Sequence, residues 1–361
     1  MNIKAILLGS AAALAAVSGA QAADAIVAAA PEPAEYVRVC DAFGTGYFYI
    51  PGTETCLKIS GYVRAQVDYS SLDGGRNWNA KTRGLVTFNA KNDSEIGTIG
   101  STITVRAWQG GSTTGLNNAA NDTNSVELDE AFITAGGFMV GSFYNYWDTG
   151  LSGETDALGS NRLNSIAYNY KSDTFFAGIA VDELNGLSGT DSSVSRTGSA
   201  TGSVYNPSYN RDNSVGIEGQ VGASFGPATV TLLGGYDFVA QEGAVRGIAS
   251  IVAGPGTFSI AGVYSSGANA YYDASKWSVA AEYAAKITDK LTLTPGIQYF
   301  ADTQVDARGS FGGRDITRAG LTVDYKIASG LTTKVSAQYQ DKTATGASDV
   351  WTGFVRLQRS F

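Results

Sequence analysis

Short and long connections alternate along the whole chain, and this alternation most constrains the fold. From Leu57 to Phe361, segments with apolar residues at every second position are separated by turn signals. Seven connections are short, as at 136–137 and 254–256, and the eight that alternate with them are long and rich in Gly, Ser, Asn and Asp. Such an arrangement places tight turns at one end and long loops at the other, which is typical of an up-and-down β-barrel and has no reason in a soluble β-sandwich.

The segment Leu57–Tyr69 shows the side-chain pattern in detail. Val63 and Val67 share one face, and Arg64 and Asp68 share the other. Apolar-out, polar-in alternation is expected of a barrel wall in a membrane. We therefore predict an all-β fold, a 16-stranded antiparallel transmembrane β-barrel. The predicted strands are 57–69, 82–90, 97–108, 126–135, 138–143, 163–170, 174–181, 214–223, 228–236, 244–252, 257–264, 277–287, 291–300, 316–327, 331–340 and 350–361.

The first residues have the organisation of an export signal. Lys4 lies in a short basic stretch, Ala5–Ala16 is apolar, and Ala20-Gln21-Ala22 is a small-x-small cleavage site. We predict a signal peptide at 1–22 and a single barrel domain at 23–361; a buried N-terminal helix is the alternative. After the leader, no apolar run approaches the 18 or more residues that a membrane helix requires.

Composition favours a barrel and excludes several classes of function. The chain has 45 Gly, 19 Tyr and 15 Phe, and barrels use Tyr and Phe as girdles at the two membrane surfaces. It has no His, which excludes Ser-His-Asp catalysis and removes the commonest zinc ligand. The net charge of −8, without a basic stripe, argues against nucleic acid as a partner. We expect no enzymatic activity, no cofactor and no metal.

Two cysteines, Cys40 and Cys56, follow the leader. In an exported chain they have one intramolecular pairing, and the periplasm is oxidising, so we predict a disulfide. Closing a loop of this length stabilises the folded chain by about 3 kcal/mol in the chain-entropy model. Free thiols are the alternative.

The loop after the hairpin at 131–143 is the strongest candidate for a functional site. The two strands of this hairpin meet at Gly136-Gly137, and the residues 144–162 follow. We interpret 144–162 as a constriction loop that folds into the barrel and narrows it. Its aromatic residues are Tyr144, Tyr146 and Trp147, and its acidic residues are Asp148, Glu154 and Asp156.

Basic residues on the first three predicted strands face the same bore. Arg64, Arg83 and Arg106 all have the parity of the polar face. Opposed rows of acids and arginines across a narrow aqueous pore create a transverse field, which favours polar solutes over apolar ones. With a Debye length of about 8 Å, the field acts only in the narrowest zone. The alternative is that these are solvated loop acids and ordinary wall arginines.

Four segments carry a family resemblance. The residues 39–44, 46–64, 127–133 and 355–361 resemble the alphaproteobacterial general porins of the rhizobial and Brucella type. The resemblance implies a homotrimer of sixteen-stranded barrels whose third long loop folds inward. The first few strands and the last would form its interface, since their apolar faces carry small residues (Gly61, Ala65 and Gly353). The terminal Phe361 resembles the signal that the barrel-assembly machinery reads.

These features together predict a function. We expect a multi-pass protein of a Gram-negative outer membrane, in contact with membrane lipid and lipopolysaccharide. We expect general diffusion of small hydrophilic solutes and ions with a weak preference for cations. A substrate-specific channel, for instance for sugars, would need an aromatic slide, for which Tyr144, Tyr146 and Trp147 are the candidates. A surface anchor or adhesin would have a closed lumen.

Overall fold

The computed structural model describes residues 37–71, 77–110, 125–159, 161–184, 214–306, 308–341 and 349–361. The predicted leader, 1–22, lies outside the described residues, as do 111–124 and 185–213 in two long loops. Val39–Phe361 form one unit, which is the subject below. Across the described ranges, every helix is too short to span a bilayer.

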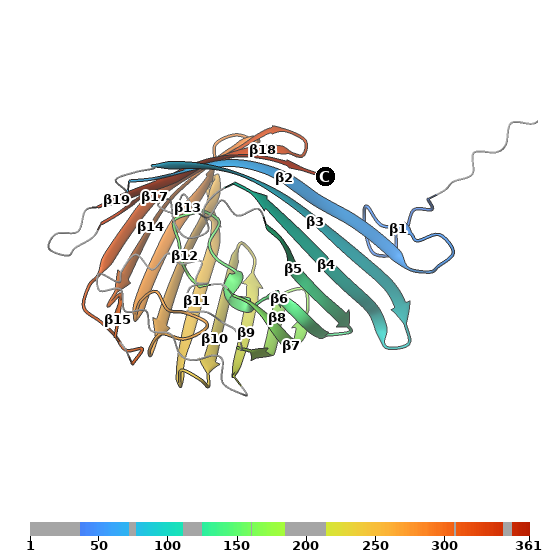
Figure 1. Cartoon of the computed structure of the whole chain (residues 1–361), viewed down its shortest axis with the longest axis horizontal. Helices are drawn as coiled ribbons and strands as arrows, with labels where there is room; N and C mark the ends of the chain where they lie inside the picture. Colours follow the sequence, from blue (N-terminus) through green and yellow to red (C-terminus); the bar gives the residue numbers. More distant parts are fainter. Residues whose placement is uncertain are drawn as a thin grey trace, which may run out of the picture. The chain divides into compact units, whose positions relative to one another are not determined.

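Sixteen antiparallel strands close into a barrel in the described part of the chain (Figure 1). Each strand pairs with the next along the chain, and β19 pairs with β2, so that no wall strand has an unpaired edge. All sixteen predicted strands are confirmed. They are β2 (Cys56–Ser70), β3 (Trp78–Ser94), β4 (Gly97–Gln109), β5 (Ser125–Ala135), β6 (Phe138–Tyr144), β7 (Arg162–Lys171), β8 (Phe175–Glu183), β9 (Val215–Phe225), β10 (Ala228–Asp237), β11 (Glu242–Ala253), β12 (Gly256–Ser265), β13 (Trp277–Lys286), β14 (Leu291–Ala301), β17 (Ile316–Ala328), β18 (Leu331–Gln340) and β19 (Val350–Ser360).

The last residue completes the closure of the barrel. The backbone N–H of Phe361 donates to the carbonyl oxygen of Gly61 at 3.0 Å, and the N–H of Gly61 donates to that of Phe361 at 3.1 Å. A Cβ on Gly61 would lie 2.2 Å from the carbonyl oxygen of Leu85. Glycine is therefore required at this position of β2, because the backbone of the neighbouring strand β3 lies so close.

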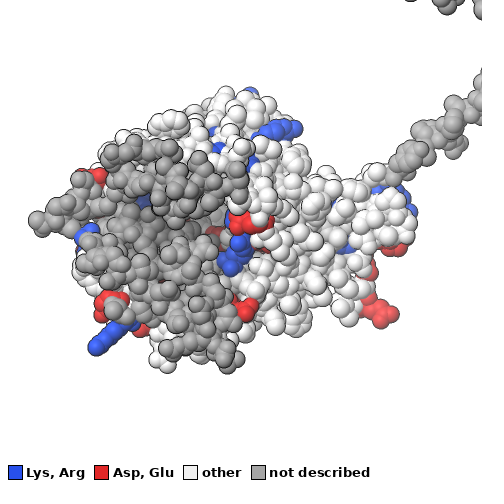
Figure 2. Space-filling model, viewed as in Figure 1, with Lys and Arg blue, Asp and Glu red and all other residues white. Residues whose placement is uncertain are grey.

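The alternation of side chains sorts the two faces of the wall. Val63 and Val67 on β2 point outward and are exposed, whereas Gln66 between them is buried inside. Figure 2 shows that the described surface over β2–β4 is almost free of charged residues, and that charges gather toward the strand ends. An uncharged band with charged rims is what the interior of a bilayer requires of a protein surface.

Smaller elements extend the barrel at its N-terminus. The strand β1 (Phe48–Tyr49) pairs with the start of β2. The predicted disulfide is confirmed: Cys40 and Cys56 are bonded, with their Cα atoms 6.0 Å apart. Tyr47 packs against this disulfide.

The sequence analysis did not predict β1, nor the short hairpin of β15 (Gln304–Val305) and β16 (Phe311–Gly312) between β14 and β17.

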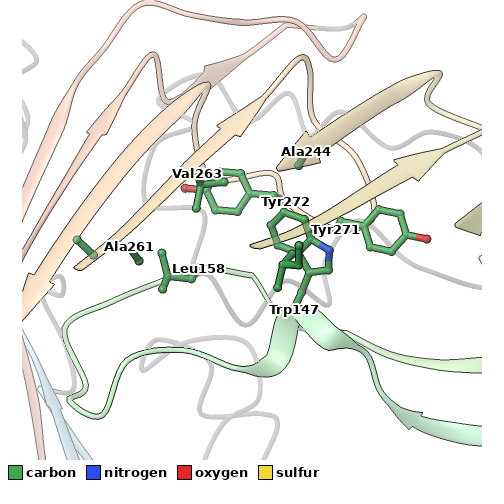
Figure 3. Close-up of a cluster of buried hydrophobic side chains, with 9 residues drawn as sticks. Trp147, Leu158, Ala244, Ala261, Val263, Tyr271 and Tyr272 are labelled. Carbon is green, nitrogen blue, oxygen red and sulfur yellow. The ribbon is translucent and has the colours of Figure 1, made fainter. Parts of the chain in front are cut away.

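A buried apolar cluster fills part of the barrel interior (Figure 3). Trp147 comes from the short helix η1 (Tyr146–Asp148) in the loop after β6, and it has no exposed surface. Its ring centroid lies 6.2 Å from that of Tyr271 and 6.4 Å from that of Tyr272, which belong to the connection between β12 and β13. Val263 is among the inward residues of β12 that complete the cluster. Two long connections are thus anchored to each other inside the barrel.

Candidate pore and inner loop

The loop between β6 and β7, residues 145–161, is here called the inner loop. Its base is closed by two hydrogen bonds between its ends. The N–H of Asn145 donates to the carbonyl oxygen of Asn161 at 2.8 Å, and the N–H of Asn161 donates to Oδ1 of Asn145 at 3.1 Å. Figure 1 shows this green segment running through the space that the strands enclose. Tyr144, which was predicted as part of the loop, is the last residue of β6.

Arg246 on β11 holds both limbs of the inner loop. Its Nη1 donates to the carbonyl oxygens of Trp147 at 2.8 Å and Leu158 at 2.9 Å, and its Nη2 donates to that of Tyr146 at 3.3 Å. The guanidinium also lies 5.2 Å from the centre of the Trp147 ring. Arg246 is 1% exposed, so these carbonyl groups take the place of water around its charge.

The tip of the inner loop is held by Glu282 on β13. Glu282 accepts hydrogen bonds from the N–H of Ser152 at 2.7 Å and from the N–H of Gly153 at 2.8 Å. Further along, Gln298 on β14 accepts from the N–H of Ala157 at 2.6 Å. The inner loop therefore runs against the inside of β11, β13 and β14, and the barrel supplies acceptors for loop amides that have no partner of their own.

The charge of Glu154 meets two cations on the C-terminal wall. Its Oε1 lies 3.0 Å from Nζ of Lys334 on β18 and 3.6 Å from Nη1 of Arg356 on β19. Its backbone N–H donates to Oγ1 of Thr322 on β17 at 3.0 Å. The inner loop thereby reaches from η1 to the strands that close the barrel.

The other two predicted acids of the loop have different surroundings. Asp148 is exposed at the end of η1. Asp156 is half-buried and accepts a hydrogen bond from the N–H of Leu151 at 3.2 Å. Burial raises the pKa of Asp156, and the negative charge of Glu282 raises it further.

On the N-terminal wall, Arg106 belongs to a closed ionic network. It lies 2.7 Å from Glu127 and 3.0 Å from Asp129, and Arg162 on β7 lies 2.6 Å from Asp129. The hydroxyl of Tyr144 donates to Asp129 at 3.1 Å. A register shift between β4 and β5 supports this arrangement, since Thr104 faces Glu130 while the next residue faces Leu128. Asp129, the extra residue, points inward like Glu127.

Arg64 and Arg83 are placed differently from Arg106. They are directly opposite each other on β2 and β3. Their Cζ atoms lie 4.7 Å and 5.4 Å from the centre of the same Tyr62 ring, and Arg83 also lies 4.8 Å from that of Trp108. Among the described residues, no carboxylate forms an ion pair with either of them.

The structure gives different surroundings to the residues that the sequence analysis grouped together. None of the described ion pairs joins Asp148, Glu154 or Asp156 to the predicted arginines. Trp147 is fully buried, and the hydroxyl of Tyr146 donates to Asn169 at 2.8 Å. The contacts of the inner loop come from residues that the sequence analysis did not single out: Arg246, Glu282, Gln298, Lys334 and Arg356. Arg246 and Glu282 lie on predicted strands, between small or apolar neighbours and with inward parity. A charged residue in such a position could have been recognised from the sequence as a contact inside the barrel.

Comparisons with known proteins agree with this architecture. Outer membrane protein IIIA of Rhizobium leguminosarum bv. viciae is 46% identical over 349 residues, which cover 94% of this chain and 90% of that protein. Porin Omp2a of Brucella suis biovar 1 is 33% identical over 395 residues, covering 100% of both.

Solved structures share the fold at low sequence identity. The outer membrane channel DcaP of Acinetobacter baumannii superposes with a TM-score of 0.61 at 13% identity, covering 87% of this chain and 99% of that one. A mutant of the Rh. blastica porin superposes with a TM-score of 0.57 at 14% identity, covering 84% and 100%.

A model of the porin subfamily matches residues 24–356, nearly the whole of the barrel. With a closed sixteen-stranded wall, an uncharged outer band and full-length relatives among alphaproteobacterial porins, this chain belongs to the porin subfamily and is a multi-pass outer-membrane porin of Gram-negative bacteria.

Proposed function

We propose that this porin is a general diffusion channel whose inner loop is the constriction. The observation that carries the proposal is the fixed position of the loop: Arg246 holds its base, Glu282 holds its tip, and Glu154 reaches β18 and β19. The apolar cluster around Trp147 occupies the β11–β13 side of the interior. The solute path then lies on the other side, between the inner loop and the charged wall of β2–β5.

The charge balance of the chain supports a weak preference for cations. Acids exceed bases by 33 to 25 in the chain, and Asp148 is exposed on the inner loop. Four cations of the interior, Arg106, Arg162, Lys334 and Arg356, are neutralised by carboxylates within 4 Å. We therefore propose that the preference is small, because most fixed charges near the path are already paired.

Two alternatives fit less well. A sugar-specific slide needs exposed aromatic faces, and Trp147 offers none because it is buried against Tyr271 and Tyr272. In a surface anchor with a closed lumen, a half-buried arginine such as Arg64 that faces the interior without a carboxylate partner would be costly. We also propose that the chain has no enzymatic activity, since its site offers charge and a passage rather than a nucleophile and base.

Other parts of the proposal rest on sequence and family. We propose a signal peptide at 1–22, one barrel domain at 23–361 and a homotrimer, with Phe361 as the signal for the barrel-assembly machinery. The outer face of β2, β3 and β19 supports the trimer. There, Ala65, Ala80 and Val355 are among the lining of an outward groove of about 490 Å³ that a neighbouring barrel could cover. We further propose contact with membrane lipid and lipopolysaccharide around the remaining wall.

Single-channel recording in a planar bilayer under a salt gradient tests the proposal. We expect stepwise openings in threes and a small reversal potential that favours cations. The triple variant D148N/E154Q/D156N should shift the reversal potential toward anions, whereas Asp289→Asn, in the turn before β14, should not. Folded and inserted protein without conductance would overturn the diffusion channel in favour of an anchor.

A further inference from the structure

Arg64 and Arg83 form a like-charged pair in the path proposed above. They are cross-strand neighbours, and both point to the interior. Like charges directly opposite each other on neighbouring strands destabilise a sheet. The fold offsets this cost with aromatic faces, because Tyr62 contacts both guanidinium groups and Trp108 contacts that of Arg83.

The hydrogen-bonding groups of this pair are open. Nε of Arg64 donates to Gln358 at 2.9 Å, and its two terminal nitrogens have no partner among the described residues. Arg83 has no hydrogen bond in the described part, and its Nε is shielded from water. By contrast, Arg106 and Arg356 are each within 4 Å of a carboxylate, and the buried Arg246 donates to three carbonyl oxygens.

The rings around the pair restrict its motion without using its donors. A guanidinium stacked near an aromatic face keeps its edge free, and this edge carries the N–H groups that pair with planar oxyanions. The Tyr62 ring contacts both guanidinium groups. Trp108 lies on β4, directly opposite Arg83. The pair is therefore held in position, while the terminal nitrogens of Arg64 and the N–H groups of Arg83 have no acceptor among the described residues.

We propose that Arg64 and Arg83 form a binding site for small solutes that carry a carboxylate or phosphate group. This inference rests on the diffusion function, because the solute reaches the site through the pore. Two oxygens of one group would accept hydrogen bonds from the guanidinium edges, as in bidentate pairing. Chloride has no such geometry, so the site distinguishes oxyanions from halides independently of the overall preference for cations.

Single-channel current in mixed salts tests the site. At constant ionic strength, replacing part of the chloride with inorganic phosphate or with succinate should lower the current in a saturable way. The half-effect concentration is the concentration of oxyanion that gives half of the maximal decrease in current. The oxyanion with the lower half-effect concentration binds more tightly. The double variant R64K/R83K keeps both charges and removes the planar edges, and R64Q/R83Q removes the charges as well. We expect the half-effect concentration to rise about tenfold in R64K/R83K, the change that corresponds to the loss of one good charge-assisted hydrogen bond.

A matched control is Lys290→Gln, which removes one positive charge from the turn before β14. It should leave the response to phosphate and succinate as in the wild type. An open channel with no saturable response, or with the same response in R64K/R83K, overturns the binding site while leaving the diffusion function intact. If the protein does not conduct, equilibrium dialysis of folded protein in detergent with labelled phosphate still decides, since binding that depends on Arg64 and Arg83 needs no current.

Discussion

The guanidinium group of Arg246 donates to the carbonyl oxygens of Tyr146, Trp147 and Leu158, and so joins residues that lie twelve positions apart along the inner loop. The same group on Arg106 meets two carboxylates, and on Arg64 it meets a single amide. One residue type thus anchors a loop, closes an ionic network and offers an open edge. The difference lies in the partners that each strand position provides.

Replacing Arg246 with Met should release the inner loop. Met fills a similar volume but has no hydrogen-bond donor. Three loop carbonyls lose their buried donor, and each unsatisfied group costs about 1–3 kcal/mol. We expect higher open-state conductance and increased current noise in single-channel recording, because the loop leaves the wall part of the time. Lys290→Met, in a turn, is the control. Unchanged conductance and noise would show that Glu282 and the Trp147 cluster hold the loop by themselves.

Asp156 should give the channel a pH dependence. Burial and the nearby charge of Glu282 raise the pKa of Asp156, so it takes up a proton at a higher pH than an ordinary carboxylate does. As the pH falls through this raised pKa, a negative charge disappears from the inner loop and the preference for cations should decrease. Reversal potentials measured over a pH series test this. In Asp156→Asn this pH-dependent change of the reversal potential should be absent. If it persists, another titratable group causes it.

At the scale of elements, the strands and the loops differ in how far the sequence determines them. Every wall strand could be predicted because lipid and water impose a period of two on each of them. The inner loop could be located from the hairpin at Gly136, but not its path. Its position depends on Tyr271 and Tyr272, more than a hundred residues away, and on single charges such as Arg246. Contacts of that kind leave no periodic signal.

The register shift in β5 shows another limit. By strict alternation, Glu127 and Asp129 share a face and Glu130 takes the other one. The register shift between β4 and β5 ends that alternation, and the N–H of Tyr144 donates to Glu130 at 3.5 Å. A bulge inserts one residue at the cost of a local irregularity, and the sequence gives no clear mark of where it occurs.

The disulfide-bonded segment is an element whose stability can be tested separately from the wall. The double variant C40S/C56S should lose about 3 kcal/mol of loop-closure stabilisation, while the strands of the barrel stay paired. We expect chymotrypsin to cleave near Phe43 and Tyr47 in this variant and in reduced wild type, with the barrel fragment left intact. Oxidised wild type is the control. Equal resistance would mean that Lys58 and Lys91, which lie against the Tyr47 ring, are enough to hold the segment.

At the scale of the whole molecule, the two sides of the barrel have different surroundings. The interior beside β11–β13 is packed with aromatic residues, and the interior beside β2 and β3 is charged. The charged side is also the one whose outer face carries small residues and the groove near Ala65. A neighbouring barrel against this face would support the wall from outside, where no apolar cluster of described residues such as that around Trp147 supports it from inside.

Filling that groove should therefore separate the proposed trimer. Ala65→Trp places a large side chain on the outer face of β2, where it would prevent close contact between barrels but remain compatible with lipid. We expect monomers in mild detergent, by light scattering, and single rather than triple current steps in the bilayer. Ala249→Trp, an outward position on β11 across the barrel, should leave the trimer intact. Trimers that survive in Ala65→Trp would place the interface on another face, and monomers in both variants would point to general destabilisation of the barrel.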